Sequence, residues 1–221
     1  RRDTAQRLLV DRHLAAAVPA LTALARQGES YLGRLHALWT LDGLGAIDWP
    51  TLTQATRHEH PGVRATALRL MDKMDREQWR TRVVEEITVL VAERGETDPT
   101  VLQQALITLS AAATQPDDYR LLMEIVAKRS GDLGRTAALT GLAGRETACL
   151  KVAMQPSESV PKAVREAFIR DLSTLIEIGT TEGAPVAPVV NYDSLTAEEV
   201  KRAKLGAEKY ATLCASCHQS H

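Results

Sequence analysis

Apolar residues recur along this chain in a short pattern that is typical of packed helices. In each copy an alanine stands beside a leucine or phenylalanine, and another leucine or a methionine follows three or four residues later. The large residues that open the copies are Leu38, Leu68, Leu106, Leu139 and Phe168, which gives steps of 30, 38, 33 and 29 residues. Self-similarity at this spacing predicts a helical solenoid, with a second amphipathic helix between successive copies.

Residues that favour helix starts and ends divide the chain in the same way. Asp48 and Asp98 each stand shortly before a proline, an arrangement that favours a helix N-terminus. The other expected starts and ends are His60-Pro61, Pro116-Asp117, Gly28, Gly95 and Gly131. These signals predict about ten or eleven helices between Asp3 and Ile178. One helix pair cannot bury its apolar face alone, so we expect the pairs to stack on a continuous core.

The helical pattern stops at Gly179. Residues 179–193 contain two glycines and two prolines without a helical charge pattern, and they predict an extended linker. From Ser194 to Glu199, residues that favour helix caps are followed by acidic residues. Residues 194–221 are therefore predicted to begin with one more helix, which runs towards Cys214.

Composition narrows the class of protein. Apolar residues make up 44% but aromatic residues only 4%, which favours closely packed helices over a β-sandwich. The 27 basic and 28 acidic residues leave a net charge of −1, so nucleic acid is not an expected partner. No apolar run approaches the ~18 residues that would suggest a membrane span. The chain opens without Met and shows no signal peptide, so we expect an internal fragment of a longer protein.

One motif near the end of the chain carries a chemical signature. Cys214, Cys217 and His218 form the Cys-x-x-Cys-His arrangement that attaches a c-type haem. The two cysteines are expected to form thioethers with the haem vinyl groups, and His218 is expected to be the proximal ligand of the iron. The chain ends at His221, so we expect the cytochrome body and its sixth ligand to be missing. Without haem, the thiols are expected to form a disulfide or to bind adventitious Zn²⁺ with His218 and His221.

Two parts of the chain resemble known families. Gly206, Tyr210 and the motif that follows them are similar to the N-terminal helix and haem site of class I cytochromes c. Residues 2–10 and 34–44 resemble HEAT-repeat segments of large exported bacterial proteins, which join a β-propeller, a HEAT array and a C-terminal cytochrome c. The resemblance implies an all-α, HEAT/armadillo-like α-solenoid over residues 1–178. A linker and one helix of a truncated cytochrome c domain would follow it.

The resemblance also implies a function. The fragment would be a non-catalytic scaffold that positions a c-type cytochrome for electron transfer from a sugar or alcohol dehydrogenase domain. Its partners would be its own dehydrogenase and cytochrome domains and another redox protein, in the periplasm or outside the cell. Haem c would be the parent's cofactor. Pyrroloquinoline quinone would belong to the propeller, which resembles quinoprotein glucose or sorbosone dehydrogenases and is absent here. The alternative is a stand-alone HEAT-type binding protein whose terminal Cys/His cluster binds a metal or senses redox state.

The remaining candidate residues are expected to be structural. Cys149 lies in an apolar helical pattern and is expected to be a small buried residue. The charged residues between Asp72 and Glu86 are expected to pair along one exposed helix. Residues expected in turns are His13, His58 and His60, and those expected to pack are His36, Trp39, Trp49 and Trp79.

Overall fold

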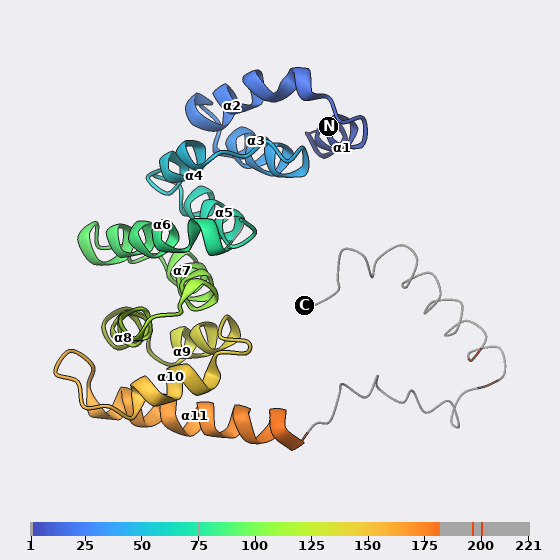
Figure 1. Cartoon of the computed structure of the whole chain (residues 1–221). Coiled ribbons are helices and arrows are strands. Elements are labelled where there is room, and N and C mark those ends of the chain that lie inside the picture. The colour runs from blue at the N-terminus through green and yellow to red at the C-terminus, as the bar shows by residue number, and fades with distance from the viewer. Residues whose placement is uncertain (1, 75, 182–195, 197–199, 201–221) are drawn as a thin grey trace. The chain divides into compact units, whose positions relative to one another are not determined.

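The computed structural model describes residues 2–74, 76–181, 196 and 200 (Figure 1). The chain divides into two compact units, Arg1–Ile178 and Gly179–His221. In the second unit Val200 is helical, and its backbone N–H donates to the Thr196 carbonyl oxygen at 3.0 Å. The rest of the predicted C-terminal helix, with residues 182–193 of the predicted linker, lies outside the described residues.

The described part of the first unit consists of helices and turns. Eleven α-helices follow one another there: α1 Arg2–Asp11, α2 Val18–Gln27, α3 Tyr31–Gly43, α4 Trp49–Ala55, α5 Pro61–Met71, α6 Arg76–Thr88, α7 Pro99–Ala112, α8 Pro116–Ile125, α9 Gly131–Thr140, α10 Glu146–Ala153 and α11 Lys162–Thr181. Two π-helical segments, Val89–Glu93 and Val126–Ser130, continue α6 and α8. A 3-10 turn over Ala15–Ala17 precedes α2.

The helices stack as pairs. In Figure 1, α4, α6 and α8 lie on one side of the stack and α5, α7 and α9 on the other. The second helices of successive pairs contact one another, from α3 to α5, from α5 to α7 and from α7 to α9. All five copies of the apolar pattern lie on second helices, namely α3, α5, α7, α9 and α11. The predicted solenoid of helix pairs is thus the observed architecture of this part of the chain.

The repeated leucines form the core that joins the pairs. Leu38, Leu68 and Leu106 are each completely buried, as is Phe168 in the looser copy. The fourth copy differs from its prediction only at the leucine, because Ala138 is fully buried like the alanines of the first three copies while Leu139 is only partly buried. A small residue at position 138 of α9 fits the close approach of α9 to α7, which Gly134 and Gly141 also allow.

Several helix starts follow the predicted capping. Asp48 accepts from the Thr51 backbone N–H at 2.8 Å at the start of α4. Asp98 does the same for Thr100 and Val101 at the start of α7. These bonds satisfy backbone donors that the first turn of a helix leaves without partners.

Two expectations about helix boundaries were wrong. The segment 72–86 is not one helix, because α5 ends at Met71 and α6 begins at Arg76, with a turn between them. Helix α11 continues to Thr181, so Gly179 lies inside the helix and not at its end. A single glycine costs a helix only about 1 kcal/mol relative to alanine, which the rest of a long helix can offset.

Among the described helices, none has the length and apolarity needed to cross a membrane.

Gly141 permits the close approach of α9 to α7. A Cβ atom at this position would overlap the Ile107 carbonyl oxygen and the Ser110 hydroxyl. We expect Gly141→Ala to destabilise the fold by about 1–3 kcal/mol, because backbone atoms of α7 would have to move. The measurement is the urea midpoint followed by far-UV circular dichroism.

The control for this substitution is Gly33→Ala. Gly33 lies in α3, whereas Gly141 follows the last residue of α9, and a Cβ at Gly33 would meet its nearest atoms at 3.6 and 3.8 Å, which is ordinary contact. Alanine at Gly33 should be neutral or stabilise the fold by up to about 1 kcal/mol. Equal destabilisation by the two substitutions would contradict the close approach at Gly141.

Candidate functional site

The predicted haem-attachment residues lie outside the described residues. These residues are Cys214, Cys217, His218 and the nearby His221. The candidate chemistry of the described part must therefore come from other groups. Within that part, no cluster of three or more His, Cys, Asp or Glu side chains is arranged to hold a metal ion.

Cys149 is an inert core thiol, as its sequence context predicted. It is completely buried in α10 and forms no disulfide. Burial raises the pKa of the thiol to about 12, so the reactive thiolate is scarce at neutral pH.

This burial predicts slow labelling of Cys149. In a Cys214→Ser/Cys217→Ser background, the native chain should react with Ellman's reagent only as fast as it opens. The same chain in concentrated urea should react immediately. Labelling at the rate of a free peptide thiol in the native state would contradict the buried position of Cys149.

The histidines act as structural groups. His60 is the N-cap of α5, and its Nδ1 accepts from the Gly62 backbone N–H at 3.1 Å. Nδ1 of His58 accepts from the His60 backbone N–H at 2.9 Å. Burial is the main cause that lowers the pKa of His58, and the nearby Arg34 adds to it. Nδ1 of His36 lies 2.9 Å from the side-chain oxygen of Gln6 and connects α3 to α1.

The tryptophans pack between neighbouring helices. The rings of Trp49 and Trp79 stack with centroids 5.6 Å apart, which joins α4 to α6. The Lys73 ammonium group lies 4.9 Å from the Trp39 ring centroid. The Arg82 guanidinium lies over Trp79 at 4.8 Å. The prediction that these rings pack is confirmed.

A set of arginines that the sequence analysis did not single out secures the turns within pairs. Arg34, Arg64 and Arg165 each occupy the fourth position of a second helix. Each guanidinium donates to two backbone carbonyl oxygens at the end of the preceding helix or in the turn after it. The signal was present, since Arg34 and Arg64 both stand three residues before the alanine of the apolar pattern. Recognising it required knowing which carbonyl oxygens face that position.

Arg64 also makes the most enclosed ion pair described in the structure. It binds Glu96 through two parallel bonds of 2.6 and 3.0 Å, with side chains only 13% and 6% exposed. Burial by itself raises the pKa of Glu96. The bonds from Arg64 and from the backbone N–H groups of Asp98 and Thr97 outweigh burial, so the pKa is lowered overall.

The prediction that Glu86 is exposed was wrong. Glu86 is buried, and its carboxylate accepts a short hydrogen bond from the Thr56 hydroxyl. Arg57 lies 3.7 Å from the other carboxylate oxygen. Glu86 thus holds α6 against the end of α4, and a charge pattern alone did not distinguish it from its exposed neighbour Glu85.

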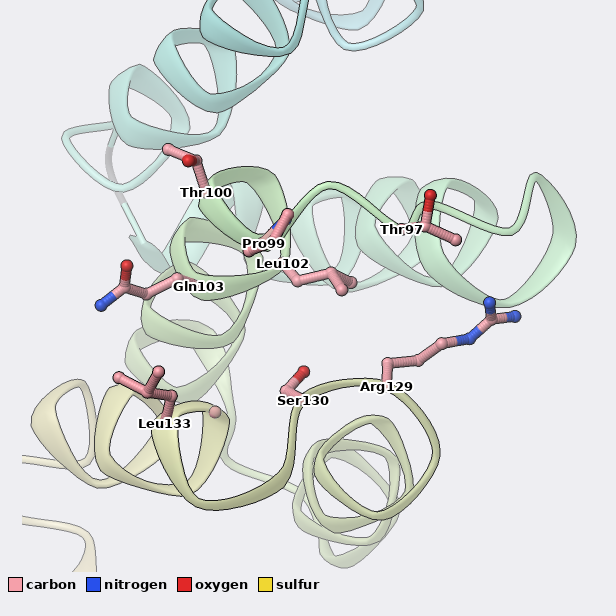
Figure 2. Close-up of a pocket in the computed structure, with 9 residues that line it drawn as sticks. Thr97, Pro99, Thr100, Leu102, Gln103, Arg129, Ser130 and Leu133 are labelled. Carbon is pink, nitrogen blue, oxygen red and sulfur yellow. The ribbon is translucent and has the colours of Figure 1, made fainter.

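A cavity of about 300 Å³ lies between the starts of α7 and α9 (Figure 2). Leu102, Pro99 and Leu133 supply its apolar lining, and Leu133 is 77% exposed. The polar groups around it belong to Thr97, Thr100, Gln103, Arg129 and Ser130. None of these residues was among the sequence-predicted candidates, because the cavity arises only when two repeats are placed side by side.

The bend at Gly131 places two of the lining residues. Gly131 has φ +54° and ψ −143°, a conformation that residues with a Cβ avoid. It turns the chain from the π-helical segment into α9, and Arg129 and Ser130 stand just before this bend. Ser130 has φ −133° and ψ −17°, and its hydroxyl makes no capping bond to α9.

Comparison with known proteins agrees with the repeat architecture. The family model for HEAT repeats matches residues 49–143. This range spans three helix pairs, from α4 to α9. No curated protein and no solved structure matches the chain. The described helices therefore form a HEAT-like helical repeat region.

Proposed function

We propose that this chain is the scaffold segment of an exported redox protein. The helical repeat region would hold domains or partners in place, and it would do no chemistry itself. The observation that carries the proposal is the Cys214-Ala-Ser-Cys217-His218 motif in the same chain as a stack of helix pairs. Helical repeats build extended surfaces from stacked pairs, which suits them to hold other domains.

The residues of the motif fit covalent haem by their chemistry. Two thiols three positions apart supply two thioethers, and the adjacent imidazole supplies an axial nitrogen ligand. Cys214 and Cys217 would be the anchors, and His218 would be the proximal ligand. When bound, the haem would supply one-electron transfer. The other half of the proposal is that the repeat region does no chemistry. It is supported by Cys149, which packs in the core, and by His36, His58 and His60, whose imidazoles bind neighbouring groups of the fold.

The wider context follows the same resemblance. The electron donor would be a sugar or alcohol dehydrogenase domain of the parent protein, a propeller that uses pyrroloquinoline quinone. The acceptor would be another redox protein, in the periplasm or outside the cell. These parts rest on the likeness of residues 2–10, 34–44 and 206–218 to the families named above.

The test is to export the proposed parent protein, with this chain joined to its full cytochrome domain, in a bacterium that has a covalent haem-attachment system. We expect the intact mass to increase by one haem, and the Cys214→Ser/Cys217→Ser variant to show no increase. His218→Ala is the matched control for ligation, since it should keep the adduct while its visible spectrum changes.

Two results would overturn the proposal. A chain that stays haem-free while a co-expressed cytochrome c matures would reject haem attachment. Stoichiometric Zn²⁺, or a reversible disulfide between the two cysteines, would instead favour a stand-alone HEAT-type binding protein with a terminal Cys/His cluster.

A further inference from the structure

We propose that the cavity between α7 and α9 binds a carboxylate side chain of an extended partner peptide, next to an apolar side chain of the same peptide. The inference goes beyond the proposed function, because it concerns the repeat region alone and needs no haem. It rests on the composition of the cavity, on unpaired polar groups and on an exposed leucine.

The positive charge of the cavity lining favours an anionic ligand. Arg129 is the only charged residue among those that line it. Within the described residues, its guanidinium has no ion pair or hydrogen bond. Along the sequence, the acidic residue nearest to Arg129 is Asp132. It does not line the cavity, and its carboxylate accepts a hydrogen bond from Arg135 Nη1 at 2.6 Å. A carboxylate that enters the cavity would therefore meet a cation whose donors are still available.

A second, independent observation is the Ser130 hydroxyl. It is buried and has no hydrogen-bond partner in the structure. Figure 2 shows this hydroxyl directed between Pro99 and Leu102 on one side and Arg129 on the other. A buried hydroxyl without a partner is unfavourable, and a ligand acceptor would remove this cost. The backbone N–H groups in the first turn of α9 add positive potential at the same end.

The apolar lining argues for a peptide over a small inorganic anion. Leu133 is the most exposed large apolar side chain described, and the exposed Pro99 also lines the cavity, together with the buried Leu102. A phosphate or acetate ion would leave the Leu133 and Pro99 side chains in water. An apolar side chain beside the carboxylate would cover them.

Uncharged polar groups at the rim suit a peptide backbone. The Gln103 amide and the Thr97 and Thr100 hydroxyls have no hydrogen-bond partner among the described residues. In Figure 2 they stand around the apolar side chains and not among them. Peptide N–H and C=O groups can pair with such donors and acceptors in either direction. The cavity volume of about 300 Å³ is at the lower end of the range for ligand sites, which fits a site for two neighbouring side chains.

The test uses the full chain and a defined probe. The peptide acetyl-Ala-Leu-Glu-Leu-Ala-amide is titrated into ¹⁵N-labelled protein, and amide shifts are followed near the start of α9. We expect saturable shifts, and about tenfold weaker binding for the peptide with Gln in place of Glu. Arg129→Gln should weaken the Glu peptide by a similar factor and leave the Gln peptide unchanged. Leu133→Ala should weaken both peptides.

The controls separate the proposal from simpler effects. Arg12→Gln removes an exposed arginine elsewhere and should leave binding unchanged, and Arg129→Lys should retain part of the affinity. Circular dichroism verifies that each variant is folded. Equal affinity for the Glu and Gln peptides would overturn the proposal, as would the absence of shifts at millimolar peptide. Acetate or phosphate alone that binds as tightly as the peptide would show a general anion site instead.

Discussion

We expect Leu106→Asp to abolish the cooperative unfolding of the helical repeat region. Leu106 is completely buried at the centre of α7, which contacts the helices before and after it in the stack. An aspartate there would be a buried carboxylate without a partner, and a cavity would replace the leucine side chain. The loss of unfolding free energy should exceed about 4 kcal/mol, among the largest values for single substitutions. The measurement is urea unfolding followed by far-UV circular dichroism.

The matched control for this prediction lies on the same helix. Gln103 is exposed in α7, so Gln103→Asp adds the same charge without burying it. It should change stability by less than about 0.5 kcal/mol. Leu38→Asp should unfold the first pairs and spare the later ones, because each pair depends mainly on its neighbours. A cooperative transition for Leu106→Asp with an unchanged midpoint would contradict the continuous core.

The second large effect is expected at the ion pair between Arg64 and Glu96. Arg64→Met keeps much of the packing of the arginine stem but leaves the Glu96 carboxylate enclosed without its partner. It also removes the bonds to the carbonyl oxygens of His58 and Glu59. We expect a loss of about 3–5 kcal/mol at pH 7. Urea midpoints of the two chains, measured from pH 7 to pH 4, provide the test.

The pH dependence gives this prediction a direction. The pKa of Glu96 is lowered in the folded chain, so its carboxylate stabilises the fold above the pKa of an unfolded glutamate. That contribution is lost as the pH falls through the lower, folded-state pKa. Arg64→Met removes the hydrogen bonds and the positive charge of the arginine, which are causes of the lowered pKa of Glu96, so less stability remains to be lost as the pH falls. The stability difference between the two chains should therefore shrink as the pH falls.

Surface ion pairs provide the control. Arg7 and Asp11 in α1 lie 3.5 Å apart with exposed side chains, so Arg7→Met should cost less than about 1 kcal/mol at any pH in this range. A cost for Arg64→Met that is as small, or that grows as the pH falls, would contradict the stabilising role of the pair.

Much of the fold could be predicted from the sequence because each repeat carries apolar residues at the positions that the fold buries. Leu38, Leu68 and Leu106 occupy equivalent positions, and their spacing is the spacing of the pairs. Asp48 and Asp98 could be identified as caps because aspartate is a favoured N-cap residue and proline is tolerated in the first turn that follows. In the fourth copy the sequence pattern overestimated the burial of Leu139, because it gives this residue the same position as the buried leucines of the other copies.

The candidate cavity could not be predicted, for a physical reason. Leu102 belongs to α7, whereas Arg129 and Leu133 lie at the other edge, across the turn into α9. No local pattern relates these residues, and the side-by-side placement of two repeats brings them together. Glu86 was misjudged in the same way, since its burial depends on the position of Thr56 in the preceding pair.

The central claim is that redox chemistry belongs to the Cys214–His218 motif and that the repeat region is scaffold. Haem per exported parent protein, with the full cytochrome domain present and measured as the pyridine haemochrome, tests it most directly across three forms of the protein. The account predicts one haem in the wild-type chain, one in Cys149→Ser and none in Cys214→Ser/Cys217→Ser. Haem that persists in the double variant and disappears in Cys149→Ser would contradict the account.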